Sequence, residues 1–89
     1  MRSPKNPIHP GEMLLEEFLI PAGEAQAAFA GRIGWTRARL NELIRGKRGV
    51  TAEAALDLAE LLGTTAKLWM NLQATWDLDQ AAKRRRRAA

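Results

Sequence analysis

The residues best suited to chemistry in this chain are basic side chains gathered in one short segment, Gln26 to Lys47. Arginine offers a planar fork of donors that fits guanine O6 and N7 or a phosphate group. Residues 32–48 hold six Lys and Arg side chains against one Glu, a net charge of +5, whereas residues 1–31 carry −2 and residues 49–82 carry −4. A basic band that stands out from an acidic body predicts a polyanionic partner.

The same segment has the residue spacing of a helix-turn-helix. Counted from Gln26, the fifth residue is Ala30, whose methyl group suits the point where two helices cross steeply. The ninth is Gly34, which tolerates the positive φ that such a turn favours. The apolar positions that would hold the second helix on the first are Phe29, Ile33, Trp35, Leu40 and Leu43.

In a helix-turn-helix the N-terminal end of the second helix enters the DNA major groove. Arg37 and Arg39 suit guanine, and Glu42 suits either cytosine N4 or an ion pair that orients an arginine. Side chains that reach phosphate set the register on the duplex. The base-reading candidates are Thr36, Arg37, Ala38 (toward a thymine methyl), Arg39, Asn41 and Glu42, and the phosphate candidates are Gln26, Arg45, Lys47 and Arg48.

The sequence pattern predicts five helices and no strand, an all-α fold that positions this segment. Pro10 suits a first helical position, Pro21 should stop the first helix at about Ile20, and Thr36 and Thr51 suit N-caps. The predicted helices cover about residues 10–20, 24–33 and 36–45, then start after Thr51 (closed by Gly63) and after Thr64 or Thr65. Residues 1–9 are predicted to be a flexible arm, residues 10–80 the domain and residues 81–89 a basic tail.

The last predicted helix has more apolar surface than a terminal helix of so small a domain needs. Its stripe indicates a dimer or partner interface, with core packing as the alternative, and consists of Leu68, Trp69, Leu72 and Trp76. The tail from Lys83 to Arg87 is either a solvated end or an additional phosphate contact. His9, just before Pro10, is expected to form a local hydrogen bond or cap.

The composition argues against an enzyme. The chain has 89 residues, one histidine and no cysteine, which leaves no metal cluster and no base–nucleophile pair in the sequence. No cofactor, membrane or small-molecule ligand is expected, because no apolar run approaches a membrane span and the glycines form no phosphate-cradling motif. The absence of cysteine and of a secretory signal fits the cytoplasm.

Three motifs in residues 9–79 carry a family resemblance: HPGEMLLEEFL, NELIRGKRGVTAEAALDLAELLGT and LWMNLQATWDL. With them the chain resembles the HigA (VapI) antitoxin family, in the lambda-repressor-like, XRE-type helix-turn-helix group. The resemblance implies a homodimer that binds a palindromic operator, represses its own toxin–antitoxin operon and neutralises a HigB-type toxin, a RelE-like mRNA endonuclease. It also implies DNA contact by the base-reading candidates named above and, of the phosphate candidates, by Gln26, Arg45 and Lys47.

Two positions depart from the family pattern. Ala25 stands where a Ser or Thr commonly caps the first motif helix, and Trp35 stands where a small aliphatic residue is usual. Ala25 predicts a frayed helix start or one that uses Glu24, and Trp35 predicts a larger core or an aromatic edge beside the DNA. Two other functions fit the same residues: a solitary XRE-type regulator without a toxin, and an adaptor associated with RNA or the ribosome.

Overall fold

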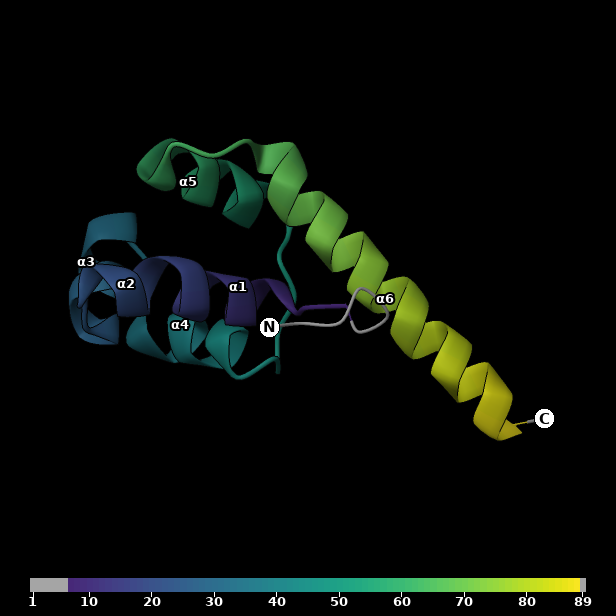
Figure 1. Ribbon diagram of the computed structural model, residues 1–89. Helices are drawn as coiled ribbons and strands as arrows, with labels where there is room; N and C mark the ends of the chain where they lie inside the picture. Colours follow the sequence, from purple (N-terminus) through teal and green to yellow (C-terminus); the bar gives the residue numbers. More distant parts are fainter. Residues whose placement is uncertain (1–6, 89) are drawn as a thin grey trace.

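The computed structural model describes residues 7–88, and these residues form helices with no strand (Figure 1). The all-α helix-turn-helix prediction is therefore confirmed. The helices are α1 (Pro10–Leu14), the π-helical turn η1 (Leu15–Leu19), α2 (Ile20–Ala22), α3 (Gln26–Ile33), α4 (Arg37–Ile44), α5 (Ala52–Leu62) and α6 (Ala66–Ala88). Of the predicted arm, residues 1–6 lie outside the described residues.

The segments α1, η1 and α2 form one N-terminal helix that passes through Pro21. The prediction that Pro21 stops this helix at Ile20 is wrong. Proline lacks the N–H that an α-helix needs. In η1, however, the backbone hydrogen bonds span five residues instead of four, and the Ile20 N–H donates to the Leu15 carbonyl. The helix ends instead at Gly23, whose φ of 64° is left-handed.

The predicted caps explain where the next helices begin. Thr36 Oγ1 accepts a 3.0 Å hydrogen bond from the Arg39 N–H, and Thr51 Oγ1 accepts one of 3.2 Å from the Ala54 N–H. Gly34 has the predicted positive φ, 78°. Ala25 gives α3 no side-chain cap, and α3 begins at Gln26 rather than at Glu24, because the backbone of Ala25 is extended (φ −70°, ψ 149°). The Glu24 carboxylate pairs with Arg32 at 2.9 Å instead of capping the helix.

The core lies where α1, α3, α4, α5 and the first half of α6 meet. It contains the predicted motif residues Phe29, Ala30, Trp35, Leu40 and Leu43, and Ile33 packs half-buried against it. The other buried apolar side chains come from the surrounding helices and from the loop before α5, which contributes Val50: Leu14, Leu19, Val50, Ala54, Ala55, Leu58 and Trp69. The surrounding helices thus fix the two motif helices from both sides.

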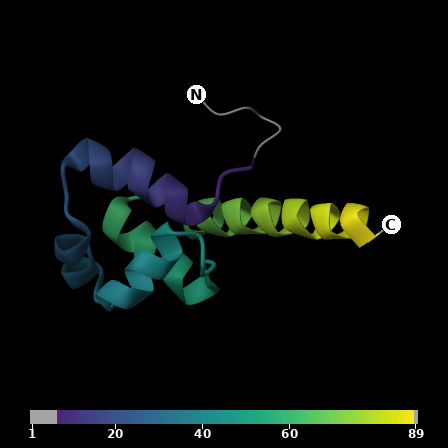
Figure 2. The same cartoon turned by 90° about the horizontal axis from the view of Figure 1, so that it is seen from below.

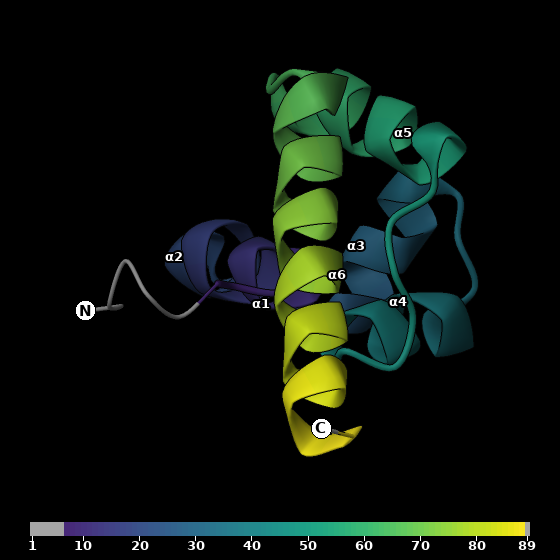
Figure 3. The same cartoon turned by 90° about the vertical axis from the view of Figure 1, so that its right-hand side faces the viewer.

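The last helix, α6, runs without a break to Ala88, so residues 81–88, predicted as a separate tail, are helical. Its first half packs on α5 and contacts α1. Its second half projects beyond the other helices (Figures 1, 2 and 3). The molecule is accordingly elongated, with extents of 45 × 27 × 23 Å.

Candidate nucleic-acid interface

Four of the predicted contact residues meet at the surface where the start of α3 faces α4. Gln26, Arg37, Ala38 and Asn41 line one shallow hollow, which we call the reading surface. Asn41 Nδ2 donates a 3.3 Å hydrogen bond to Gln26 Oε1, so the two amides orient each other. This leaves Gln26 Nε2 and Asn41 Oδ1 available to a partner. Arg37 and Ala38 are exposed beside them.

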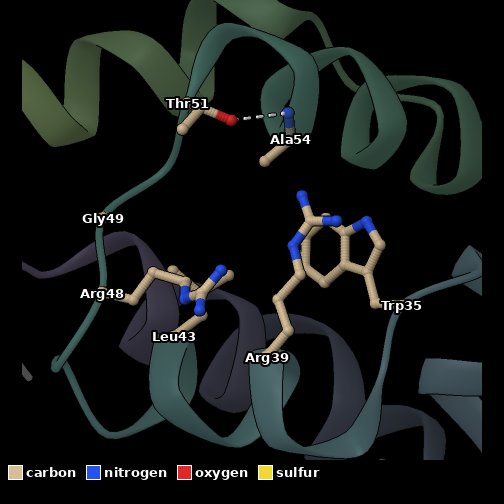
Figure 4. Close-up of a pocket in the computed structure, with 7 residues that line it drawn as sticks. All are labelled: Trp35, Arg39, Leu43, Arg48, Gly49, Thr51 and Ala54. Atoms are coloured by element: carbon tan, nitrogen blue, oxygen red, sulfur yellow. Dashed lines mark hydrogen bonds between the residues drawn. The ribbon is translucent and has the colours of Figure 1, made fainter.

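Arg39 does not line the reading surface. Its guanidinium carbon lies 4.2 Å from the centroid of the Trp35 ring, and both residues line a separate hollow toward α5 (Figure 4). Arg37 and Arg39, each predicted to read guanine, therefore line two different hollows in this structure. On α4 the two arginines are two residues apart, so about 200° of rotation separates their side chains.

Trp35 belongs to the core, with 7% of its surface exposed. Its Nε1–H donates a 3.0 Å hydrogen bond to Asp57 Oδ2 on α5. Of the two readings of this unusual residue, the enlarged core is confirmed, and the ring face that remains is covered by Arg39. The sequence offered no sign of the Asp57 partner, which is 22 residues away.

Glu42 forms an ion pair, but not with the arginines on its own helix. Its Oε1 accepts from Arg48 Nη2 at 2.8 Å and from Arg48 Nε at 3.0 Å. Both side chains remain about half exposed, so the pair is solvated and contributes little to stability. The interaction does orient Arg48 beside the end of α4.

The other cations of the basic band differ in how far they are neutralised. Arg32 pairs with Glu24 at 2.9 Å. Arg37, Arg45 and Lys47 are exposed and have no ion-pair partner within residues 7–88. The uncompensated charge is thus concentrated on the reading surface and at the C-terminal end of α4, as a phosphate-binding flank requires.

The HPGE motif positions α1 against α4, on the side away from the reading surface. His9 caps α1, since its Nδ1 accepts a 3.0 Å hydrogen bond from the Gly11 N–H, which confirms the predicted capping role. Burial lowers the pKa of His9 below 6.5, although the negative charges of Asp77 and Glu12 act in the opposite direction. The imidazole is 5% exposed and meets the Trp76 ring edge-on, with centroids 5.1 Å apart.

Gly11 is a positioning residue that the sequence analysis missed. A Cβ at this position would collide with the backbone carbonyl of Leu43, so only glycine lets α1 approach the end of α4 so closely. The only sequence feature that could have indicated this role is the presence of glycine in the HPGE motif, at a position where any helix-forming residue would otherwise be expected.

Gln73 is a second residue that the sequence analysis missed. Its Oε1 accepts a 2.7 Å hydrogen bond from the Val50 N–H, and its Nε2 donates to Asp77 Oδ1 at 2.9 Å. The side chain also closes over Gly49, where a Cβ would lie 2.9 Å from the Gln73 amide. Gln73, the last residue of the WMNLQ motif, therefore joins α6 to the loop that follows α4.

The predicted interface stripe on α6 faces mostly inward. Trp69 is fully buried and its Nε1–H donates to Thr64 Oγ1 at 2.7 Å, so its assignment to a partner interface is wrong and core packing is confirmed. Leu68 and Leu72 pack half-buried against the core, and Trp76 against His9. The most exposed large apolar side chain of the described residues is Leu78, at 72%.

The described residues contain no group of three His, Asp or Glu side chains that could hold a metal ion. No helix in residues 7–88 is long and apolar enough to cross a membrane. What the site offers a partner is hydrogen-bonding groups and positive charge on a rigid helix pair.

Comparison with known proteins agrees with this architecture. A family described as helix-turn-helix matches residues 15–69. Virulence-associated protein I of Dichelobacter nodosus is 43% identical over 74 residues, which cover 83% of this chain and 68% of that protein. Antitoxin HigA-1 of Vibrio cholerae is 41% identical over 78 residues, 86% of this chain and 72% of that protein.

A solved structure shares both fold and sequence with this chain. The structure of Pseudomonas aeruginosa antitoxin HigA with the higBA promoter superposes with a TM-score of 0.87 at 35% identity, covering 93% of this chain and 90% of that one. The resemblance noted in the sequence is thereby confirmed. The chain belongs to the XRE-type helix-turn-helix family, in the group that contains virulence-associated protein I and the HigA antitoxins.

Proposed function

We propose that this protein is a HigA-type antitoxin that binds operator DNA and represses its own operon. The observation that carries the proposal is the reading surface, where Gln26, Arg37, Ala38 and Asn41 meet on a helix-turn-helix whose nearby cations are exposed. The HigA relative whose structure was solved with the higBA promoter supports DNA as the partner.

Each member of the reading surface has a defined role in the proposal. Arg37 donates to guanine O6 and N7, and Ala38 contacts a thymine methyl. The free Oδ1 of Asn41 accepts from a base, while Gln26, at the N-terminus of α3, meets a phosphate. Thr36 caps α4 and so stabilises the helix end that enters the groove.

The phosphate flank consists of Arg45 and Lys47, with Arg48 held by Glu42. Two copies related by a two-fold axis place two such surfaces about 34–36 Å apart on one face of the duplex. This spacing suits a palindromic operator upstream of the protein's own reading frame.

The DNA part is tested by measuring binding to a labelled duplex from that upstream region against a scrambled duplex. We expect Arg37→Ala to weaken operator binding by about 5- to 150-fold, or about 1–3 kcal/mol. Arg32→Ala removes the same charge from a side chain already paired with Glu24, so it serves as the matched control. Equal binding of operator and scrambled duplex would contradict the proposal and favour an RNA- or ribosome-associated adaptor.

The antitoxin part rests on the HigA name of its relatives. We propose a HigB-type toxin of the RelE-like mRNA endonuclease class as the protein partner. Co-expression with the adjacent reading frame, followed by affinity purification, should yield a complex that protects cells from that frame's product. A protein that binds its operator but retains no neighbouring gene product would instead be a solitary regulator.

A further inference from the structure

The last turns of α6 carry five successive basic residues, Lys83 to Arg87, which we call the basic end. All five are exposed, and they lie on a continuous helix rather than on a loose tail. They also lie outside residues 15–69, which the helix-turn-helix family matches, so the family resemblance implies nothing about them. Their charge and their place in the fold therefore decide what they bind.

Only the first of these cations is neutralised within the chain. Lys83 Nζ lies 3.0 Å from Asp79 Oδ2, one helical turn back. Within residues 7–88 there is no ion-pair partner for the next four: Arg84, Arg85, Arg86 and Arg87. The helix dipole is equivalent to about half a negative charge at this end, so it offsets only a small part of four positive charges. Most of the charge of the basic end is thus left for an anion outside the chain.

The direction of α6 brings this charge to the side of the molecule on which α4 lies. In Figures 1 and 3, α6 starts beside α5 at the top and ends lower than α4. Partway along, Gln73 accepts its hydrogen bond from Val50 in the loop that follows α4. The same loop contains the phosphate flank. The basic end therefore extends past this flank, in the direction that leads away from α5.

The helical rise sets how far the arginines reach. Arg84 and Arg87 lie 11 and 14 residues beyond Gln73, which at 1.5 Å per residue is about 16 and 21 Å. Both lengths exceed the width of the DNA major groove, which is about 12 Å. The arginines of the basic end are therefore placed to meet backbone phosphates other than those beside the loop after α4.

The sequence of four arginines in a row also determines the kind of contact. At about 100° of rotation per residue, their side chains point to all sides of α6, so at least one faces a duplex on any side. Guanidinium groups spread in this way bind phosphate oxygens but do not present one fixed set of donors to a base. Such contacts raise the affinity and its salt dependence without changing which DNA sequence is preferred.

We infer that the basic end of α6 is a second DNA-binding site, which holds backbone phosphates of the operator while the reading surface contacts its bases. This inference rests on the proposed operator binding and adds a contact outside the helix-turn-helix. Double-stranded DNA is favoured over RNA because α6 extends to the side of α4, the helix proposed to read DNA.

Two matched variants test the charge of the basic end. The first carries Gln and the second Lys at the same four positions: Arg84, Arg85, Arg86 and Arg87. Gln and Lys have helix propensities close to that of Arg, and only Lys keeps the charge. Far-ultraviolet circular dichroism confirms that α6 still forms in both variants.

Fluorescence anisotropy with a labelled operator duplex, at about 50 to 200 mM salt, measures the effect. We expect the Gln variant to lower the slope of log K against log salt by about 2–4 per protomer, since each phosphate contact contributes about 0.9. Its affinity at the lowest salt should fall at least about tenfold. The Lys variant should keep the slope, and both variants should keep the wild-type preference for operator over scrambled duplex.

Proximity to the duplex is tested by directed cleavage, since the chain contains no cysteine. Ala88→Cys, labelled with an iron–EDTA reagent that generates hydroxyl radicals, should cut the bound operator at discrete positions. The matched control is Leu56→Cys, at a side chain 61% exposed on α5, which lies on the other side of the molecule from α4. This control should leave the duplex uncut.

Operator binding by the wild type, measured in parallel, keeps the two claims apart. If the wild type prefers its operator but the Gln variant keeps the full salt slope, or labelled Ala88→Cys does not cut, the inference is overturned and the proposed function stands. An equal loss of slope in the Lys variant also overturns it, because charge is then not the cause. If the Gln variant loses affinity for RNA but not for the operator, the basic end is an RNA contact instead. Failure of the wild type to prefer its operator contradicts the proposed function whatever the basic end does.

Discussion

The guanidinium of Arg39 lies over the face of Trp35, with its central carbon 4.2 Å from the ring centroid. Trp35 is in turn held by Asp57 on α5 through a 3.0 Å hydrogen bond. The first turn of α4 is thereby connected to α5 through three side chains, by one cation–π contact and one hydrogen bond. This relationship removes one arginine from the reading surface and leaves Arg37 on it.

Arg37→Ala and Arg39→Ala should therefore behave differently although both remove one positive charge. We expect Arg39→Ala to weaken operator binding less than about threefold while lowering the free energy of unfolding by about 0.5–1 kcal/mol through the lost cation–π contact. Arg37→Ala should affect binding and leave stability unchanged. Fluorescence anisotropy and urea unfolding measure the two effects, and equal losses of binding would restore Arg39 as a base reader.

Asp57→Ala should lower the free energy of unfolding by about 1–3 kcal/mol, because the indole N–H of a nearly buried tryptophan loses its acceptor. Asp57→Asn keeps an acceptor oxygen and should recover most of this loss. Urea unfolding followed by tryptophan fluorescence provides the measurement. If both variants are equally unstable, the carboxylate acts through its charge rather than as the partner of Trp35.

Gly11→Ala should destabilise the fold by about 1–3 kcal/mol, since the added methyl group collides with the Leu43 carbonyl. Gly31→Ala is the matched control, because Gly31 lies in α3 with nothing within 4 Å of its added Cβ. That control should stabilise by about 0.4–1 kcal/mol. Thermal unfolding of the two variants distinguishes close packing at Gly11 from a general effect of replacing a helical glycine.

Stability should also depend on pH through His9. Burial lowers its pKa in the folded protein below the ordinary 6.5, so between the two values the unfolded chain binds more protons. The free energy of unfolding should accordingly fall as the pH drops below about 6.5 toward the folded-state pKa. His9→Asn keeps an N-cap acceptor but does not titrate in this range, so it should lack this part of the slope. Urea titrations at pH 5 to 8 measure it, and identical slopes would exclude His9 as the cause.

The helix-turn-helix, its turn and its core positions were predictable from sequence because each depends on local periodicity. A methyl at Ala30, a left-handed glycine at Gly34 and hydroxyl caps at Thr36 and Thr51 act within one or two turns of chain. The exposed position of Arg37 was predictable for the same reason, since helical spacing decides which side of α4 it occupies. Arg45 and Lys47 follow the end of α4, where Gly46 was expected to stop the helix. The continuation of the first helix through Pro21 could not be predicted from the sequence, because it depends on the π-helical turn before it.

By itself the sequence determined a two-helix motif with a basic outer side, and its flanking motifs indicated the family. Only the tertiary structure decided which partners the polar side chains have. Asp57 captures Trp35 from 22 residues away, Gln73 reaches Val50 from 23, and Gly11 admits the Leu43 carbonyl. These contacts join segments whose spacing along the chain carries no period, so they arise only when the helices pack. The same packing buries Trp69 and leaves Leu78 exposed on α6.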